Sequence, residues 1–118
     1  MISAHKKWRV SAPVALATTL ALVACAGTPP TAELRGARDS VARAQFDGAA
    51  QLAPQPFQSA QDKLNSAQGS VQNNNMDLAK NMAQEAQADA DYADAVANAH
   101  KAETGATQLQ GLSQKLQR

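Results

Sequence analysis

Apolar residues recur at intervals of three and four along most of the chain after residue 30, which is the spacing of one face of an α-helix. In residues 32–47 the repeat consists of Leu34, Ala37, Val41 and Ala44. In residues 56–72 it consists of Phe57, Ala60, Leu64, Ala67 and Val71. A large residue alternates with alanine in both segments, which is typical of helices that pack along a narrow seam.

A third segment, residues 76–104, keeps the same interval but places alanine at every step. The candidate helix-packing seam consists of Ala79, Ala83, Ala86, Ala90, Ala93 and Ala97. Small side chains allow two helix axes to approach closely, so this segment is expected to be the packing partner of the other two.

Turn and capping residues divide these segments. Thr31 is the expected N-cap of the first helix, and Gly48 is expected to end it. Residues 51–56 contain two prolines, which break a helix or begin one. Residues 73–75 are three asparagines that predict a turn, and Asn75 is the expected N-cap of the third helix.

The end of the chain is less clearly assigned. Gly105 predicts a stop or a kink after the third helix. The tail, residues 105–118, carries leucines at helical spacing and is expected to be flexible, a further helix, or a continuation of the third one. These leucines are Leu109, Leu112 and Leu116.

Composition supports an all-α fold. From Cys25 onward the chain holds 21 Ala and 13 Gln, both compatible with helices, and it has no Ile. We therefore expect residues 31–104 to form an Ala-rich antiparallel helical hairpin or a three-helix bundle with a long third helix. Its core is thin, because burying an alanine removes little apolar surface from water. Self-association or an envelope protein partner would add burial.

The segment before residue 25 follows a different pattern. A cationic stretch with Lys6, Lys7 and Arg9 precedes an apolar run over residues 10–24. This order is typical of a secretory signal. The run of about 15 residues is shorter than the ~20 that a membrane-spanning helix needs. Residues 1–24 are therefore expected to be a signal peptide that is cleaved.

Cys25, the only cysteine, ends this segment. It follows Leu22, Val23 and Ala24, and the four residues resemble the lipobox of bacterial lipoproteins. The resemblance implies that the Cys25 thiol receives a diacylglycerol, that the chain is cut before it, and that the new amine is acylated. The alternative is an ordinary secretion signal followed by a cysteine with no such role.

A lipid at Cys25 would determine where the protein resides. One acyl chain binds a membrane only marginally, with K on the order of 10⁴ M⁻¹, so three would hold the protein there stably. Ala26 stands where, by resemblance to lipoprotein sorting in Gram-negative bacteria, an Asp would retain the protein at the inner membrane. We therefore expect the periplasmic face of the outer membrane, with residues 25–30 as lipidated N-terminus and linker.

Removal of the signal peptide also changes the net charge. Three of the 11 basic residues precede Cys25, which leaves eight against ten acidic residues and a net charge of −2. The mature chain therefore lacks the excess positive charge that attracts nucleic acid, and we expect no nucleic-acid partner. With a single cysteine, it is also expected to contain no disulfide.

Two stretches carry a resemblance to a known family. Residues 53–64 read Ala-Pro-x-x-Phe-x-x-Ala-x-x-Lys-Leu, and residues 76–86 read Met-Asp-Leu-Ala-Lys-x-Met-Ala-x-x-Ala. Together they resemble a family of proteobacterial lipoproteins known as domain of unknown function 4398, over residues 32–103. The resemblance implies a helical envelope protein and no assigned activity. Some longer members carry an OmpA-like peptidoglycan-binding domain, for which this sequence is expected to be too short.

The residue types needed for catalysis are sparse. His100 is the only histidine after Cys25, and we interpret it as a helix-terminal residue near the negative end of the helix dipole. No histidine or cysteine lies at ligand spacing from it, and the glycines form no phosphate-binding loop. We therefore expect no catalytic residues, no cofactor, no metal site, no small-molecule substrate and no enzymatic activity.

Four carboxylates in the third helix form the best cluster. Asp91 and Asp94 project away from the alanine seam and are expected to be solvated. Glu85 and Asp89 lie beside the seam, where a carboxylate must either pair with a cation or remain partly solvated. Three residues on neighbouring helices could supply that cation, namely Arg38, Arg43 and Lys63. A weak divalent-cation site remains an alternative, because hard cations take oxygen ligands.

Three functional classes are compatible with these features. The first is a non-enzymatic helical structural or adaptor lipoprotein of the cell envelope. The second is a peptidoglycan tether. A covalent cross-link to peptidoglycan would need a C-terminal lysine, and the sequence ends in Arg118, so only non-covalent contact is expected. The third is a small pilot or chaperone-type lipoprotein that binds an envelope protein, for which the tail leucines could line a groove.

Overall fold

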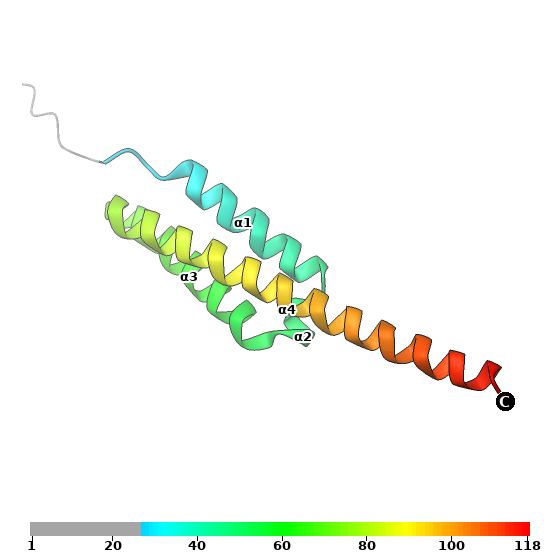
Figure 1. Cartoon of the computed structure of the whole chain (residues 1–118). Coiled ribbons are helices and arrows are strands. Elements are labelled where there is room, and N and C mark those ends of the chain that lie inside the picture. The colour runs from blue at the N-terminus through cyan, green and yellow to red at the C-terminus, as the bar shows by residue number, and fades with distance from the viewer. Residues whose placement is uncertain (1–26) are drawn as a thin grey trace, which may run out of the picture.

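The computed structural model describes residues 27–118, so the expected signal peptide and the lipobox, Leu22 to Cys25, lie outside the described residues. The described part contains no strand, which confirms the all-α fold. Its four helices are α1 (Thr31–Phe46), α2 (Ala49–Leu52), α3 (Pro54–Gln72) and α4 (Met76–Leu116) (Figure 1).

The long helix α4 is the centre of the fold and contacts each of the other three helices. α3 and α4 form an antiparallel hairpin through the turn at residues 73–75, and α1 runs in the same direction as α4 along its other edge (Figure 1). α1 and α3 contact each other less than either contacts α4. The fold is therefore a three-helix bundle, with the short α2 joining α1 to α3.

The boundaries of α1 differ slightly from those expected. Thr31 is the first helical residue and not the N-cap, because Pro30 occupies that position and its carbonyl accepts a hydrogen bond from the Leu34 N–H at 3.0 Å. At the other end, Gly48 adopts a left-handed conformation with φ of 81°, which glycine reaches without steric cost. The prediction that Gly48 ends the first helix is confirmed.

Between the first two expected helices lies the short helix α2, which the sequence did not predict. The Leu52 N–H donates to the Gly48 carbonyl at 3.0 Å, and the Ala53 N–H donates to the Ala49 carbonyl at 2.8 Å. α3 then begins at Pro54, two residues earlier than expected. Prolines at 54 and 56 both fit its first turn, where a missing N–H breaks no intrahelical hydrogen bond.

The predicted cap of the long helix is confirmed, because the Asn75 side chain accepts a hydrogen bond from the Leu78 N–H at 3.2 Å. The expected interruption at Gly105 is wrong: α4 continues through it to Leu116. A glycine in an exposed helix costs only about 1 kcal/mol relative to alanine, and the surrounding residues favour the helix. Of the alternatives for the tail, the structure shows a continuation of the long helix.

The core is built mostly of alanine. All six alanines of the α4 seam are fully buried, as are Ala37 and Ala44 of α1 and Ala60 and Ala67 of α3. The larger buried residues retain slight exposure, between 6% and 9%, and are Leu34, Val41, Phe57 and Leu64. Val71, expected in the seam of α3, is only partly buried, and the Ser70 hydroxyl beside it donates to the Ser66 carbonyl at 2.8 Å.

A substitution in the alanine seam tests this packing. Ala86→Leu should lower the free energy of unfolding by ~1–3 kcal/mol, because Ala86 is fully buried between helices and added methyl groups would force them apart. Ala95→Leu, at an exposed position of the same helix, is the matched control and should change it little. Thermal and denaturant unfolding measure both variants. Equal stability of the two would contradict the seam.

Candidate functional site

Three surfaces of α4 carry the features that could have a function. One edge of the helix faces α1, the opposite edge faces α3, and the C-terminal part projects past the end of the bundle (Figure 1). We refer to residues 105–116 as the overhang. At 1.5 Å per residue, α4 is about 60 Å long and the overhang accounts for about 18 Å of it.

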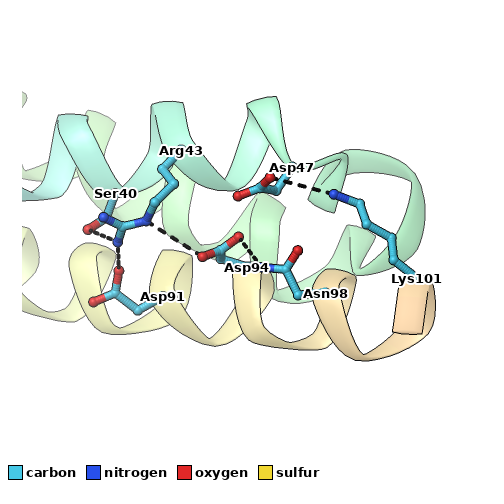
Figure 2. Close-up of polar contacts among 7 residues, drawn as sticks. All are labelled: Ser40, Arg43, Asp47, Asp91, Asp94, Asn98 and Lys101. Atoms are coloured by element: carbon cyan, nitrogen blue, oxygen red, sulfur yellow. Dashed lines mark hydrogen bonds and ion pairs between the residues drawn. The ribbon is translucent and has the colours of Figure 1, made fainter. Parts of the chain in front are cut away.

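Along the α1 edge, opposite charges face each other at three levels. Near the start of α1, Lys80 Nζ lies 3.8 Å from Glu33 Oε1, and near its end Lys101 Nζ lies 3.5 Å from Asp47 Oδ1. Between these pairs, Arg43 reaches two carboxylates of α4 and also donates to the Ser40 hydroxyl at 3.3 Å (Figure 2). These contacts fix the register of α1 against α4.

The expectation that Asp91 and Asp94 are solvated is confirmed for Asp91, whose side chain is 46% exposed, and wrong for Asp94, although both pair with Arg43. An Asp91 oxygen lies 2.5 Å from the Arg43 guanidinium, and an Asp94 oxygen lies 3.5 Å from it (Figure 2). The Asp94 side chain is only 18% exposed, and it also accepts a hydrogen bond from Asn98 at 3.0 Å. The two aspartates were expected to project away from the alanine seam into solvent, but α1 packs along that side of the helix and covers it in part.

Along the α3 edge, Glu85 and Asp89 both pair with Lys63, one of the three basic residues that the sequence offered as their partner. Its Nζ lies 3.2 Å from Glu85 and 2.8 Å from Asp89. The Ser59 hydroxyl also donates to Asp89 at 2.6 Å. Arg43 is on the other edge, and Lys63 holds both carboxylates without it.

These contacts shift the acid–base behaviour of the pair. Burial alone would raise the pKa of Asp89, but hydrogen bonds from Lys63 and Ser59 stabilise the carboxylate more strongly, so its pKa lies below the ordinary value. Hydrogen bonds to Asp89 and Glu85 raise the pKa of Lys63. Both residues therefore hold their charges over a wider pH range than isolated side chains.

The opposite shift occurs at Asp94. Burial and the neighbouring carboxylate of Asp47 raise its pKa, and these effects outweigh the attraction of Arg43. Figure 2 shows the Asp47 and Asp94 side chains close together between Arg43 and Lys101. The α1 edge thus contains a like-charge contact within its line of ion pairs.

The four carboxylates do not gather at one place. They are divided between two edges of α4, and each pair faces a basic residue of a different helix. Among residues 27–118, no group of three or more His, Cys, Asp or Glu side chains is arranged to hold a metal ion. Each carboxylate pair instead joins α4 to a neighbouring helix.

The interpretation of His100 as a helix-terminal residue is wrong. α4 continues for 16 residues beyond it, so the negative end of the helix dipole lies far away. His100 is exposed and borders an open depression of about 350 Å³, together with Leu52 of α2 and Gly105. A second depression, of about 420 Å³, lies at the other end of the bundle between residues 27–33 and the start of α4.

The overhang carries three exposed leucines. Leu109, Leu112 and Leu116 are 69%, 57% and 89% exposed. Phe46, at the end of α1, is 90% exposed. Tyr92 and Leu78 are exposed elsewhere on α4, but most of the exposed large apolar residues lie at the end of the molecule that carries the overhang, as in a contact surface.

Within the described residues, no helix is both long and apolar enough to cross a bilayer. Comparison with known families finds a match to the domain of unknown function DUF4398 over residues 32–109. The chain belongs to this family. The match spans all of α2 and α3, nearly all of α1, and α4 into the overhang, six residues beyond the expected limit. No curated protein and no solved structure matches the chain.

Sequence reasoning missed the ion pairs between α1 and α4, although a signal for them exists. The paired residues are separated by 47 to 54 positions at all three levels, with opposite signs each time. A nearly constant separation is the mark of two helices that run in parallel. The expected arrangement was antiparallel, and in that arrangement these charges would not face each other.

Two Asp→Asn substitutions should have opposite effects. Asp89→Asn should destabilise the protein at pH 7, because a carboxylate with a lowered pKa contributes stability above the unfolded value of about 3.8. Asp94→Asn should stabilise it at pH 7, because its raised pKa means that ionisation opposes folding above that value.

The destabilisation by Asp89→Asn should shrink as the pH falls below 3.8, because a carboxylate with a lowered pKa loses its contribution between the unfolded and the folded value. The stabilisation by Asp94→Asn should shrink already at higher pH, as the pH falls through the raised folded pKa toward 3.8. Thermal unfolding of the three proteins between pH 7 and acidic pH measures this. A loss of stability in both variants at pH 7 would contradict the like-charge contact at Asp94.

Proposed function

We propose that this protein is an outer-membrane-anchored periplasmic lipoprotein that acts as a non-enzymatic helical structural or adaptor protein of the cell envelope. The anchor would be a lipid on Cys25, and the lipobox-like order of Leu22, Val23, Ala24 and Cys25 supports it. Ala26 supports the outer membrane as the destination, by resemblance to lipoprotein sorting. Membership of the DUF4398 family is compatible with this role but assigns no activity.

The observation that carries the proposal is the position of the two ends of the described residues. The described residues begin at Gly27, two positions after Cys25, beside the start of α4. The overhang lies at the opposite end of the bundle (Figure 1). A chain held by a lipid at Cys25 could therefore extend its exposed leucines away from the anchor, where a partner can reach them.

The use of charge also supports a structural role. The ion pairs of the described residues join α4 to α1 or α3, at 2.5–3.8 Å, and so hold the helices in register. An acid–base catalyst needs titratable groups directed at a space that a substrate can enter. Here the two groups of carboxylates are directed at neighbouring helices.

Substitutions at the cleavage site test the anchor. Cys25→Ser should abolish labelling of the protein by radioactive palmitate and leave an uncleaved or mislocalised precursor, because serine offers no thiol for the diacylglycerol. Ala26→Ser introduces the same residue one position later and should leave labelling intact. Cell fractionation and labelling measure both. Normal labelling of Cys25→Ser would exclude lipidation at this residue.

A second substitution tests the destination separately. Ala26→Asp should move the labelled protein from the outer to the inner membrane, whereas Ala26→Ser should not. Separation of the two membranes by density measures the distribution. Outer-membrane location of Ala26→Asp would show that residue 26 does not determine sorting of this protein.

A pilot or chaperone-type lipoprotein is the second candidate, and the exposed leucines of the overhang favour it. A cross-linking group placed at position 112 in intact cells, followed by identification of the cross-linked proteins by mass spectrometry, distinguishes the pilot from the structural or adaptor role. One reproducible envelope protein whose assembly fails without this chain would favour the pilot. Adducts with the same chain, or with several envelope components, would favour the structural or adaptor role.

A further inference from the structure

The edge of α4 that faces α1 changes in character where α1 ends. Alongside α1 it carries Asp91 and Asp94, which pair with Arg43. Beyond Phe46, the last residue of α1, the same edge of α4 continues uncovered into the overhang (Figure 1). Its side chains there are leucines.

We define the leucine stripe as Gly105, Leu109, Leu112 and Leu116. With 100° of rotation per residue, these four positions fall within an arc of about 60°, centred about 90° from the alanine seam. The leucines are each more than half exposed. The stripe is therefore one continuous face of the helix with no cover from the described residues of this chain.

The spacing within the stripe is symmetric. Its steps are four, three and four residues, so the four positions, although not their residue types, are symmetric about the midpoint. If two such helices lie antiparallel about the midpoint of the stripe, Leu109 of one faces Leu112 of the other. Leu116 of one then faces Gly105 of the other. We propose that the overhang pairs antiparallel with the overhang of a second copy of this chain.

The surroundings of Gly105 fit this register. A Cβ placed on Gly105 would meet nothing within 4 Å, and the glycine borders the depression of about 350 Å³. Leu52 of α2, which is 37% exposed, lines the same depression. The Leu116 side chain of the second copy would pack over the glycine and against Leu52, which buries apolar surface of both.

The open space at Gly105 favours the antiparallel over the parallel arrangement. In a parallel pair in register, Gly105 of one copy would face Gly105 of the other, and the space there would stay unfilled. In the antiparallel pair, the Leu116 side chain of the other copy fills it.

The interface is short, about three helical turns on each copy, and falls at the low end of specific protein interfaces, below about 1,200 Å². The dimer is therefore reversible. The antiparallel dimer is a rod with the N-terminal end of one bundle at each of its two ends. If each chain carries a lipid on Cys25, both lipids can enter the same leaflet only when the rod lies parallel to the membrane surface. The pairing itself does not depend on the lipid and goes beyond the proposed function.

Disulfide trapping tests the register in the processed protein as cells produce it, kept in detergent. Gly105→Cys and Leu116→Cys chains, mixed and oxidised, should give a disulfide-linked dimer that contains one of each. Neither chain alone should do so to the same extent. The unsubstituted chain controls for Cys25. A dimer formed mainly by Leu116→Cys with itself would show a parallel pair, and no dimer in the mixture would show no pairing; either result overturns the proposal.

A matched pair of charge substitutions tests the face. Leu112→Asp should raise the dissociation constant by about tenfold or more, because the pairing would bury an unpaired carboxylate. Gln114→Asp adds the same charge on the opposite face and should leave it unchanged. Analytical ultracentrifugation across a dilution series measures both, and circular dichroism checks that both stay helical. Equal effects, or none, would contradict pairing through the stripe, whatever the outcome of the palmitate labelling.

Discussion

The close packing of alanine along α4 is the constraint on which the rest of the structure depends. The six alanines, spaced three and four residues apart, give one face of the helix only small side chains. The axes of α1 and α3 can therefore both approach it closely. The same feature limits stability, since each buried alanine removes little apolar surface from water. A bundle of this kind needs further interactions to hold its register.

The ion pairs provide that register. Alanine against alanine offers little resistance to a shift of one turn along the axis, whereas a shift would separate Arg43 from Asp91 and Lys63 from Asp89. Each pair is partly exposed and so contributes little to stability by itself. Their spacing along two edges makes the arrangement specific even though no single pair is strong. The like-charge contact of Asp47 with Asp94 is tolerated because Arg43 and Lys101 lie on either side of it.

Much of the fold follows from local patterns in the sequence. The three-and-four spacing predicted the core positions of α1, α3 and α4, and Asn75 predicted the start of α4. The errors lie where local rules compete or where the answer depends on a distant partner. Gly105 could end a helix or be carried through one, and its neighbours decided the outcome. The environment of Asp91 and Asp94 depended on where α1 lies, which no property of α4 itself specifies.

The distribution of large apolar residues is the opposite of what an isolated bundle needs. Alanines fill the centre, while Leu109, Leu112 and Leu116 lie on a helix that extends past every other element. The seam has no room for such leucines, because added methyl groups there would force the helices apart. Their position on the overhang adds nothing to the fold of the described residues. In the pairing that we propose, a second copy of this chain covers them, and the open space at Gly105 receives its Leu116.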